Sequence, residues 1–213
     1  MNDTSCQIYL LTPPKIDNLA VFCEILHKTL AAARIACLQL RLKEVGNSAI
    51  IQAGHAIRPI CHTHGTHLIV NDSPSIAKDI GADGVHLGQE DMDYFSSREL
   101  LGGDAIIGIT CHNSKELAFE AASSGADYVA FGAFFETPTK TPKTRAELEI
   151  LTWWHEAIEI PSVAIGGITV SNAKHVIEAG ADFIAVSSGV WDYPGGPEKA
   201  VMQLSALCSQ HSP

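Results

Sequence analysis

Charged side chains stand where several short apolar runs of the sequence end. Asp72 closes the run HLIVND, and Asp91 follows the run GVHLG within the stretch HLGQED. Arg41 and Lys43 close the run ACLQLRLK, and Lys140 lies in the polar stretch ETPTKTPK that follows YVAFGAF. Mg²⁺ takes one or two protein carboxylates together with phosphate oxygens and water. Two aspartates facing three cations therefore indicate a site for Mg²⁺ and a diphosphate, although either aspartate alone fits a turn or helix cap equally well.

A second group of residues has the composition of a phosphate site. Gly166 and Gly167 end the run PSVAIGG, and Ser187 and Ser188 lie within the run FIAVSSGV. Backbone N–H groups that follow the last two strands of parallel barrels commonly hold phosphate, whereas the glycine pair alone fits a plain tight turn. Two anion sites imply either one doubly phosphorylated substrate or two phosphorylated substrates.

The elements that must position these residues alternate along the whole chain. Eight β-branched runs are predicted as strands, with alanine-rich or amphipathic segments between them that are predicted as helices. This alternation, without a linker, predicts an α/β fold: a (β/α)₈ TIM barrel that forms a single domain over residues 1–213. An open doubly wound sheet is the alternative, but LLTPPK stands where its glycine-rich loop would be. The predicted strands are 7–12, 36–42, 67–72, 84–88, 105–111, 128–134, 161–167 and 183–190.

A weak internal repeat supports the parallel arrangement. The stretches DIGADGVHLG (79–88), SSGADYVAFG (123–132) and EAGADFIAVS (178–187) each contain Gly-Ala-Asp before a predicted strand. Glycine ends the preceding helix, and the step from aspartate to strand is a tight turn. Three copies of one helix-to-strand junction favour repeated βα units.

The stretch CLQLRLKE shows which way the second strand faces. Gln39, Arg41 and Lys43 alternate with three leucines, and the flanking segments are helical in pattern, which indicates a buried parallel strand. In a TIM barrel, inward residues at the carboxyl ends of the strands enter the mouth of the active site. We therefore expect the leucines to face the helices and the three polar residues to face an anionic ligand.

Composition limits the classes of partner and the compartment. The chain has 213 residues and a formal net charge of −10, which argues against nucleic acid as a partner but leaves a small anion open. An apolar run of membrane-spanning length and a secretory signal pattern are both missing, so we expect no membrane association and a cytoplasmic location. The six scattered cysteines are expected to be reduced thiols. His62, His64 and His67 in CHTHGTH are expected to be surface histidines rather than a zinc site.

Taken together, these residues resemble the thiamine phosphate synthase family, also called thiamin-phosphate pyrophosphorylases. The resemblance covers about residues 8–201 and rests on the motifs QLRLK, ND, GADGVHLGQED, GADYVAFGAFFETPTK, VAIGGI and GADFIAVSSGV, in this order. It implies a transferase that joins a hydroxymethylpyrimidine diphosphate to a thiazole phosphate, with Mg²⁺ as cofactor and thiamine phosphate and pyrophosphate as products.

The resemblance also implies a role for each matching residue. Asp72 and Asp91 would ligate Mg²⁺, and Thr110 would lie beside the pyrimidine. The catalytic contributions would come from Lys140, Arg41, Lys43 and Thr110. The pyrimidine diphosphate would be held by Gln39, Arg41, Lys43, Asn71 and Lys140, and the thiazole phosphate by Thr137, Thr139, Gly167, Ser187 and Ser188.

The chain departs from the family pattern at two positions. Thr110 replaces the usual serine of GxSxH, which keeps the hydroxyl and adds a methyl group, and Ser187 replaces an apolar residue. A thiazole tautomerase-like barrel and a non-catalytic ligand-binding barrel are the alternatives. The tautomerase would need His112 as acid–base but not the aspartate–lysine set, and the TxTK lysine argues against a non-catalytic barrel. The oligomeric state stays open.

Overall fold

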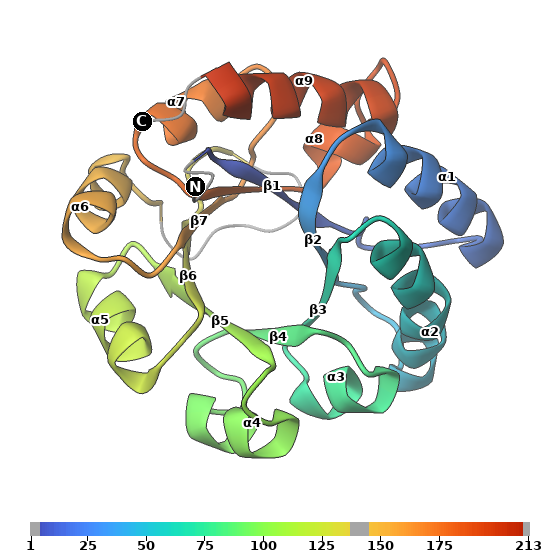
Figure 1. Ribbon diagram of the computed structural model, residues 1–213, viewed down its shortest axis with the longest axis horizontal. Coiled ribbons are helices and arrows are strands. Elements are labelled where there is room, and N and C mark those ends of the chain that lie inside the picture. The colour runs from blue at the N-terminus through green and yellow to red at the C-terminus, as the bar shows by residue number, and fades with distance from the viewer. Residues whose placement is uncertain (1–4, 137–144, 211–213) are drawn as a thin grey trace.

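The chain forms a closed barrel of eight parallel strands in this computed structural model, which describes residues 5–136 and 145–210 (Figure 1). Neighbouring strands pair in chain order, and β8 closes the barrel against β1. The expected (β/α)₈ fold is thereby confirmed. The strands are β1 (Gln7–Leu11), β2 (Ile35–Leu40), β3 (His67–Asn71), β4 (Gly84–Leu87), β5 (Ile106–His112), β6 (Tyr128–Gly132), β7 (Ser162–Ile165) and β8 (Phe183–Val186).

Helices surround the barrel as an outer ring (Figure 1). Several begin where the sequence places a capping residue: the side chains of Asn18 and Ser114 accept backbone N–H groups at the first turns of α1 and α5. None of the described helices is long and apolar enough to cross a membrane. The helices are α1 (Leu19–Ala32), α2 (Asn47–Thr63), α3 (Pro74–Ile80), α4 (Tyr94–Leu101), α5 (Lys115–Ser124), α6 (Glu149–Ala157), α7 (Ala173–Glu178), α8 (Ser188–Trp191) and α9 (Pro197–Gln210).

One strand boundary was predicted wrongly. The run 183–190 was expected to be a single strand, but β8 ends at Val186 and Ser188 begins the short helix α8. The backbone turns at Ser187, whose carbonyl accepts the N–H groups of Val190 and Trp191. The seven other predicted strands agree with the observed ones to within a few residues at each end.

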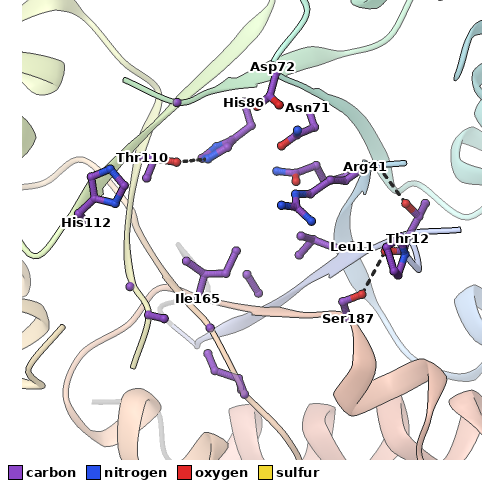
Figure 2. A pocket seen from close by; sticks show the side chains of 18 of the residues that line it. Leu11, Thr12, Arg41, Asn71, Asp72, His86, Thr110, His112, Ile165 and Ser187 are labelled. Atoms are coloured by element: carbon purple, nitrogen blue, oxygen red, sulfur yellow. Dashed lines mark hydrogen bonds between the residues drawn. The ribbon is translucent and has the colours of Figure 1, made fainter. Parts of the chain in front are cut away.

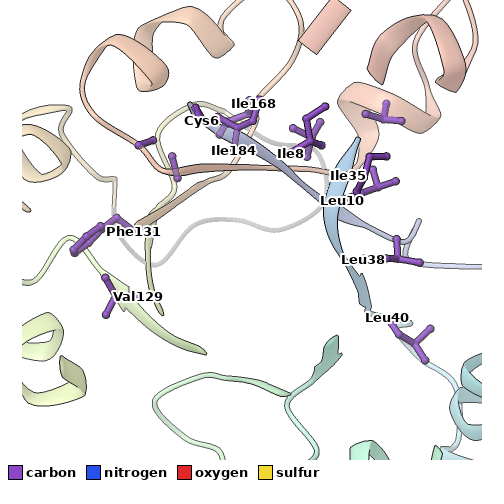
Figure 3. Close-up of a cluster of buried hydrophobic side chains, with 14 of the residues drawn as sticks. Cys6, Ile8, Leu10, Ile35, Leu38, Leu40, Val129, Phe131, Ile168 and Ile184 are labelled. Carbon is purple, nitrogen blue, oxygen red and sulfur yellow. The ribbon is translucent and has the colours of Figure 1, made fainter. Parts of the chain in front are cut away.

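Alternation along the strands divides the buried side chains into two layers. The larger layer lies between strands and helices and includes Leu38 and Leu40, which are buried and face outward (Figure 3). The inner layer fills the barrel itself and contains Tyr9, Leu11, Cys37, Ile69, Tyr128, Ala130, Val163 and Ala185. Gln39, between the two outward leucines, is only 3% exposed and reaches the inner layer through a contact with Tyr9. The expected orientation of the second strand is therefore confirmed for this residue and its two leucine neighbours.

The aspartates of the Gly-Ala-Asp repeat tie pairs of strands together. Each carboxylate accepts a backbone N–H from near the start of the preceding strand: Asp83 from Leu68 at 2.7 Å, Asp127 from Ile107 at 2.8 Å, and Asp182 from Ser162 at 2.7 Å. These bonds lie at the amino-terminal end of the barrel, opposite the carboxyl ends of the strands. The repeat is thus a structural device of the barrel floor.

We predict that Asp182→Ala lowers the free energy of unfolding by about 1–3 kcal/mol, because the N–H of the fully buried Ser162 loses its acceptor. The hydroxyl of Ser162, which also donates to Asp182 at 3.0 Å, loses its partner as well. Urea denaturation measures the change. Asp104→Ala, at an exposed position, is the control and should change stability by less than about 0.5 kcal/mol. Equal stability of the two variants would contradict the role given to the repeat.

Candidate active site

A cavity of about 390 Å³ opens at the carboxyl ends of the strands (Figure 2). Its wall brings together side chains from loops and strand ends that lie far apart in the sequence. Most of the residues that the sequence singles out line it: Gln39, Arg41, Asn71, Asp72, Asp91, Thr110, Gly167, Ser187 and Ser188. Lys43 is not among the lining residues, and Thr137, Thr139 and Lys140 lie outside the described residues.

Arg41 supplies positive charge to this cavity. It follows the last residue of β2, and its backbone N–H donates to Thr12 Oγ1 at 3.0 Å, which fixes the chain at the point where the side chain turns inward (Figure 2). Burial lowers the pKa of the guanidinium, and the nearby Asp72 carboxylate partly offsets this effect. Arginine keeps its charge at neutral pH even so. The backbone N–H of Lys43 donates to the carbonyl of Pro14 at 2.8 Å.

Two carboxylates, those of Asp72 and Asp91, line the same cavity. Asp72 has φ +65°, a left-handed conformation that aspartate tolerates better than most residues, and its N–H donates to the carbonyl of His86 at 2.8 Å. Asp91 Oδ2 accepts the N–H of Gly88 at 2.6 Å. The described residues contain no group of three or more histidines, cysteines or carboxylates that could hold a metal. Two carboxylates fit Mg²⁺, whose other ligands are then phosphate oxygens and water.

The opposite wall of the cavity is built mainly from backbone and small side chains. Gly166 and Gly167 have φ +105° and +66°, and a Cβ on Gly167 would overlap the carbonyl oxygens of Phe135 and Glu136. Only glycine allows this close approach. The hydroxyl of Ser187 donates to the carbonyl of Thr12 at 3.1 Å, so the serine that replaces an apolar residue is held by the rim of β1 (Figure 2). Ser188 begins α8, where the first N–H groups have no partner within the helix.

A continuous chain of hydrogen bonds crosses the barrel interior and ends at the cavity. Gln39 Nε2 donates to the Tyr9 hydroxyl at 2.8 Å, and the hydroxyls of Tyr9 and Tyr128 are 2.9 Å apart. The Tyr128 hydroxyl lies 3.0 Å from His86 Nδ1, and His86 Nε2 lies 2.8 Å from Thr110 Oγ1 (Figure 2). No role for Tyr9, Tyr128 or His86 was predicted from the sequence. The alternation of side chains could have identified them, because all three occupy inward-facing positions on their strands, as Gln39 and Thr110 do on theirs.

His86 is neutral at the centre of this chain. Burial lowers its pKa to about 4, and the positive charge of Arg41 acts in the same direction. Its imidazole therefore carries one proton near neutral pH, so one ring nitrogen donates and the other accepts. His86 is 7% exposed and lines the cavity, stacked on Tyr128 with ring planes 15° apart.

Cys111 and the histidines of the CHTHGTH stretch do not line the cavity. Cys111 belongs to the outer layer, is fully buried, and burial raises the pKa of its thiol to about 12. His62 pairs with Asp83 at 3.0 Å, and His64 Nε2 lies 3.1 Å from His27 Nδ1. Both histidines are near the end of α2, on the amino-terminal side of β3. His62 and His67 are exposed and His64 is half-buried, so these histidines lie at the surface.

Known proteins that this chain resembles in sequence and in structure include enzymes named for thiamine phosphate. The family model described as thiamine monophosphate synthase matches residues 8–190. A thiamine-phosphate synthase of Rhodospirillum centenum is 53% identical over 96% of this chain and 98% of its own, and one of Hyphomonas neptunium is 48% identical over 94% and 93%. Among solved structures, a thiamine phosphate pyrophosphorylase from Pyrococcus furiosus superposes with a TM-score of 0.83 at 30% identity, covering 96% of both chains.

We predict that acid weakens the fold through His86. In the unfolded chain a histidine takes up its proton near pH 6.5, whereas folded His86 does so only at about pH 4. The stability that the neutral ring contributes is therefore fully present above pH 6.5 and is lost as the pH falls toward 4. The loss across this window is about 3 kcal/mol.

Urea unfolding at several pH values between 7 and 4.5 measures this effect against the His86→Gln variant. The difference in unfolding free energy between wild type and variant should shrink steadily as the pH falls, because the variant has no ring to protonate. Parallel curves for the two proteins would show that His86 is not held neutral by the fold.

Proposed function

We propose that this chain, which belongs to the thiamine monophosphate synthase family, joins a hydroxymethylpyrimidine diphosphate to a thiazole phosphate and releases pyrophosphate. Its relatives make it a transferase of thiamine biosynthesis. The main support for this particular reaction is that one cavity has two walls of different chemical character. One wall holds Arg41 with Asp72 and Asp91, and the other holds Gly167 and Ser188. Such a cavity suits two phosphorylated substrates that face each other.

The first wall is assigned to the diphosphate. Asp72 and Asp91 would hold Mg²⁺, which when bound supplies positive charge that neutralises the leaving pyrophosphate. Arg41 is placed to pair with diphosphate oxygens, since its guanidinium lies at the cavity beside Asp72. We assign Gln39, Asn71, Lys43 and Lys140 to the same substrate; the described residues of this set that line the cavity are Gln39 and Asn71.

The second wall is assigned to the thiazole phosphate. The N–H groups of Gly167 and Ser188 are suited to an anion, because both belong to tight backbone turns at the carboxyl ends of β7 and β8. The Ser187 side chain is already bonded to Thr12, so its contribution would come from its backbone. Thr137 and Thr139, which lie outside the described residues, are assigned to this phosphate as well.

The reaction needs positioning and charge rather than a protein nucleophile. The bond between the pyrimidine methylene and the diphosphate oxygen breaks heterolytically, and the aminopyrimidine delocalises the resulting cation. The thiazole nitrogen captures this cation with its free lone pair, so no base is required there. The protein holds the two reactants in line and stabilises the charge on the leaving group. Cys111, buried in the outer layer, is not needed.

The residues that line the cavity favour the synthase over the two rival functions. A tautomerase would use His112 as acid–base and would not need the aspartate pair, yet Asp72 and Asp91 both line the cavity. A binding-only barrel would form no product from the two substrates.

We propose a cytoplasmic enzyme, since all six cysteines are free thiols, as is typical of proteins in a reducing compartment.

We predict that purified protein with Mg²⁺ and both phosphorylated substrates forms thiamine phosphate and pyrophosphate in equal amounts. A chelator should abolish the reaction and added Mg²⁺ should restore it. Asp91→Asn should lower kcat/KM on the order of 10²-fold, because the amide keeps an acceptor for Gly88 but loses the charge. Asp104→Asn is the matched control at an exposed position. Full activity of verified metal-free protein in excess chelator would remove Mg²⁺ from the proposal.

We predict a graded response at Thr110. Thr110→Ser keeps the hydroxyl and should stay within about threefold of wild type in kcat/KM. Thr110→Val keeps the shape but removes the hydroxyl, and should lose roughly tenfold, as expected for one lost hydrogen bond. Steady-state kinetics with the pyrimidine diphosphate as varied substrate decide between the two. Wild-type kcat/KM in the valine variant would show that the hydroxyl does not help to place the pyrimidine.

A further inference from the structure

The hydrogen-bond chain inside the barrel has a direction that can be obtained by counting protons. Gln39 presents its amide nitrogen to Tyr9, so the Tyr9 oxygen accepts at this end. Within the described residues, the other contact of this hydroxyl is Tyr128. Tyr9 must therefore donate to Tyr128, because the reverse arrangement would leave the proton of a hydroxyl in a 3% exposed side chain without an acceptor.

The donor and acceptor of each remaining hydrogen bond, from Tyr128 to the cavity, follow in the same way. Tyr128 accepts from Tyr9, so its own proton goes to His86 Nδ1 at 3.0 Å. A neutral imidazole that accepts at Nδ1 carries its proton on Nε2. His86 Nε2 then donates to Thr110 Oγ1 at 2.8 Å. The Thr110 hydroxyl has accepted a hydrogen bond from inside the barrel, and its own proton is left for the cavity that it lines.

The packing of the barrel keeps this chain in place. Tyr128 is stacked on His86 and meets Tyr9 edge-on, with ring centroids 5.6 Å and 5.8 Å apart. The Tyr128 ring lies against Gly108 on the neighbouring strand β5, where an added Cβ would overlap the ring. Both tyrosines are nearly fully buried, at 3% and 6% exposure. Neither phenol lines the cavity, so neither is placed to touch a substrate there.

We infer that Tyr128 and His86 are positioning residues that turn the Thr110 hydroxyl into a hydrogen-bond donor aimed at the cavity. Resting on the proposed function, this assigns to the pyrimidine an acceptor atom at that place, a ring nitrogen rather than its amino group. The Thr110 hydroxyl thus favours a heterocycle with an unprotonated ring nitrogen at this position over one with an N–H or C–H group there. Tyr9 lies farther from Thr110. It stabilises the chain of hydrogen bonds but does not determine that the Thr110 hydroxyl donates to the cavity.

Two single-atom deletions in the same barrel interior separate positioning from packing. Tyr128→Phe removes the donor to His86 Nδ1, which releases the imidazole to the other tautomer. Tyr9→Phe removes an equally buried hydroxyl but leaves Tyr128 able to donate to His86. Tyr128→Phe should lower kcat/KM for the pyrimidine diphosphate about tenfold, and Tyr9→Phe by less than about threefold. The KM for the thiazole phosphate should stay within about twofold in both variants.

A double-mutant cycle shows whether the effect passes through Thr110. In the Thr110→Val background, Tyr128→Phe should cause no further loss, because the hydroxyl that it positions is already gone. If Tyr128→Phe fails to fold by circular dichroism, His86→Asn takes its place, with the same selective loss expected. Equal effects of the two tyrosine variants, or additive losses in the cycle, would overturn the inference while wild-type activity still upholds the proposed function. A wild-type protein that forms no thiamine phosphate would instead contradict the proposed function itself.

Discussion

The alternation of side chains along eight parallel strands is the constraint on which the rest of this structure depends. Because successive residues point to opposite faces, closing the sheet sends every second side chain into the barrel and brings all carboxyl ends to one mouth. In β2 this parity buries Leu38 and Leu40 against the helices and directs Gln39 inward, and Arg41, the residue directly after the strand, lines the cavity. A shift of one residue in that strand would exchange the two sets and leave a cation buried among aliphatic side chains. The apolar outer layer therefore holds the polar inner residues at their positions.

The barrel interior shows how a polar function is accommodated inside a packed core. The floor is tied by the carboxylates of the Gly-Ala-Asp repeat, and the middle contains apolar residues such as Ile69 and Val163. Two phenols and one imidazole replace apolar groups in the same layer, where an unpaired polar atom would be costly. Each of them has two partners in the chain that runs from Gln39 to Thr110. The interior thus provides a fixed set of dipoles that leads from the core to the cavity wall.

Much of this arrangement could be predicted from the sequence, and the limits have physical causes. The fold class, the outward leucines of β2 and the polar strand ends follow from two-residue periodicity and residue type. The end of β8 was predicted wrongly because Val190 continues an apolar pattern past Ser187, where the chain turns into α8. The contact between Tyr9 and Tyr128 joins residues 119 positions apart, so it exists only once the barrel closes. Lys43 follows the inward parity of Arg41, but it lies beyond the strand, where strand parity no longer holds, and it does not line the cavity.

If the barrel interior sets the hydrogen-bonding polarity of the cavity wall, His86 must hold a single tautomer. Nitrogen-15 NMR of the imidazole side chains distinguishes a protonated ring nitrogen from a bare one, and the His86 signals are identified by their loss in His86→Gln. We expect a neutral ring at pH 7 with the proton on Nε2 and a bare Nδ1 that accepts from Tyr128. A proton on Nδ1, or a doubly protonated ring, would contradict it.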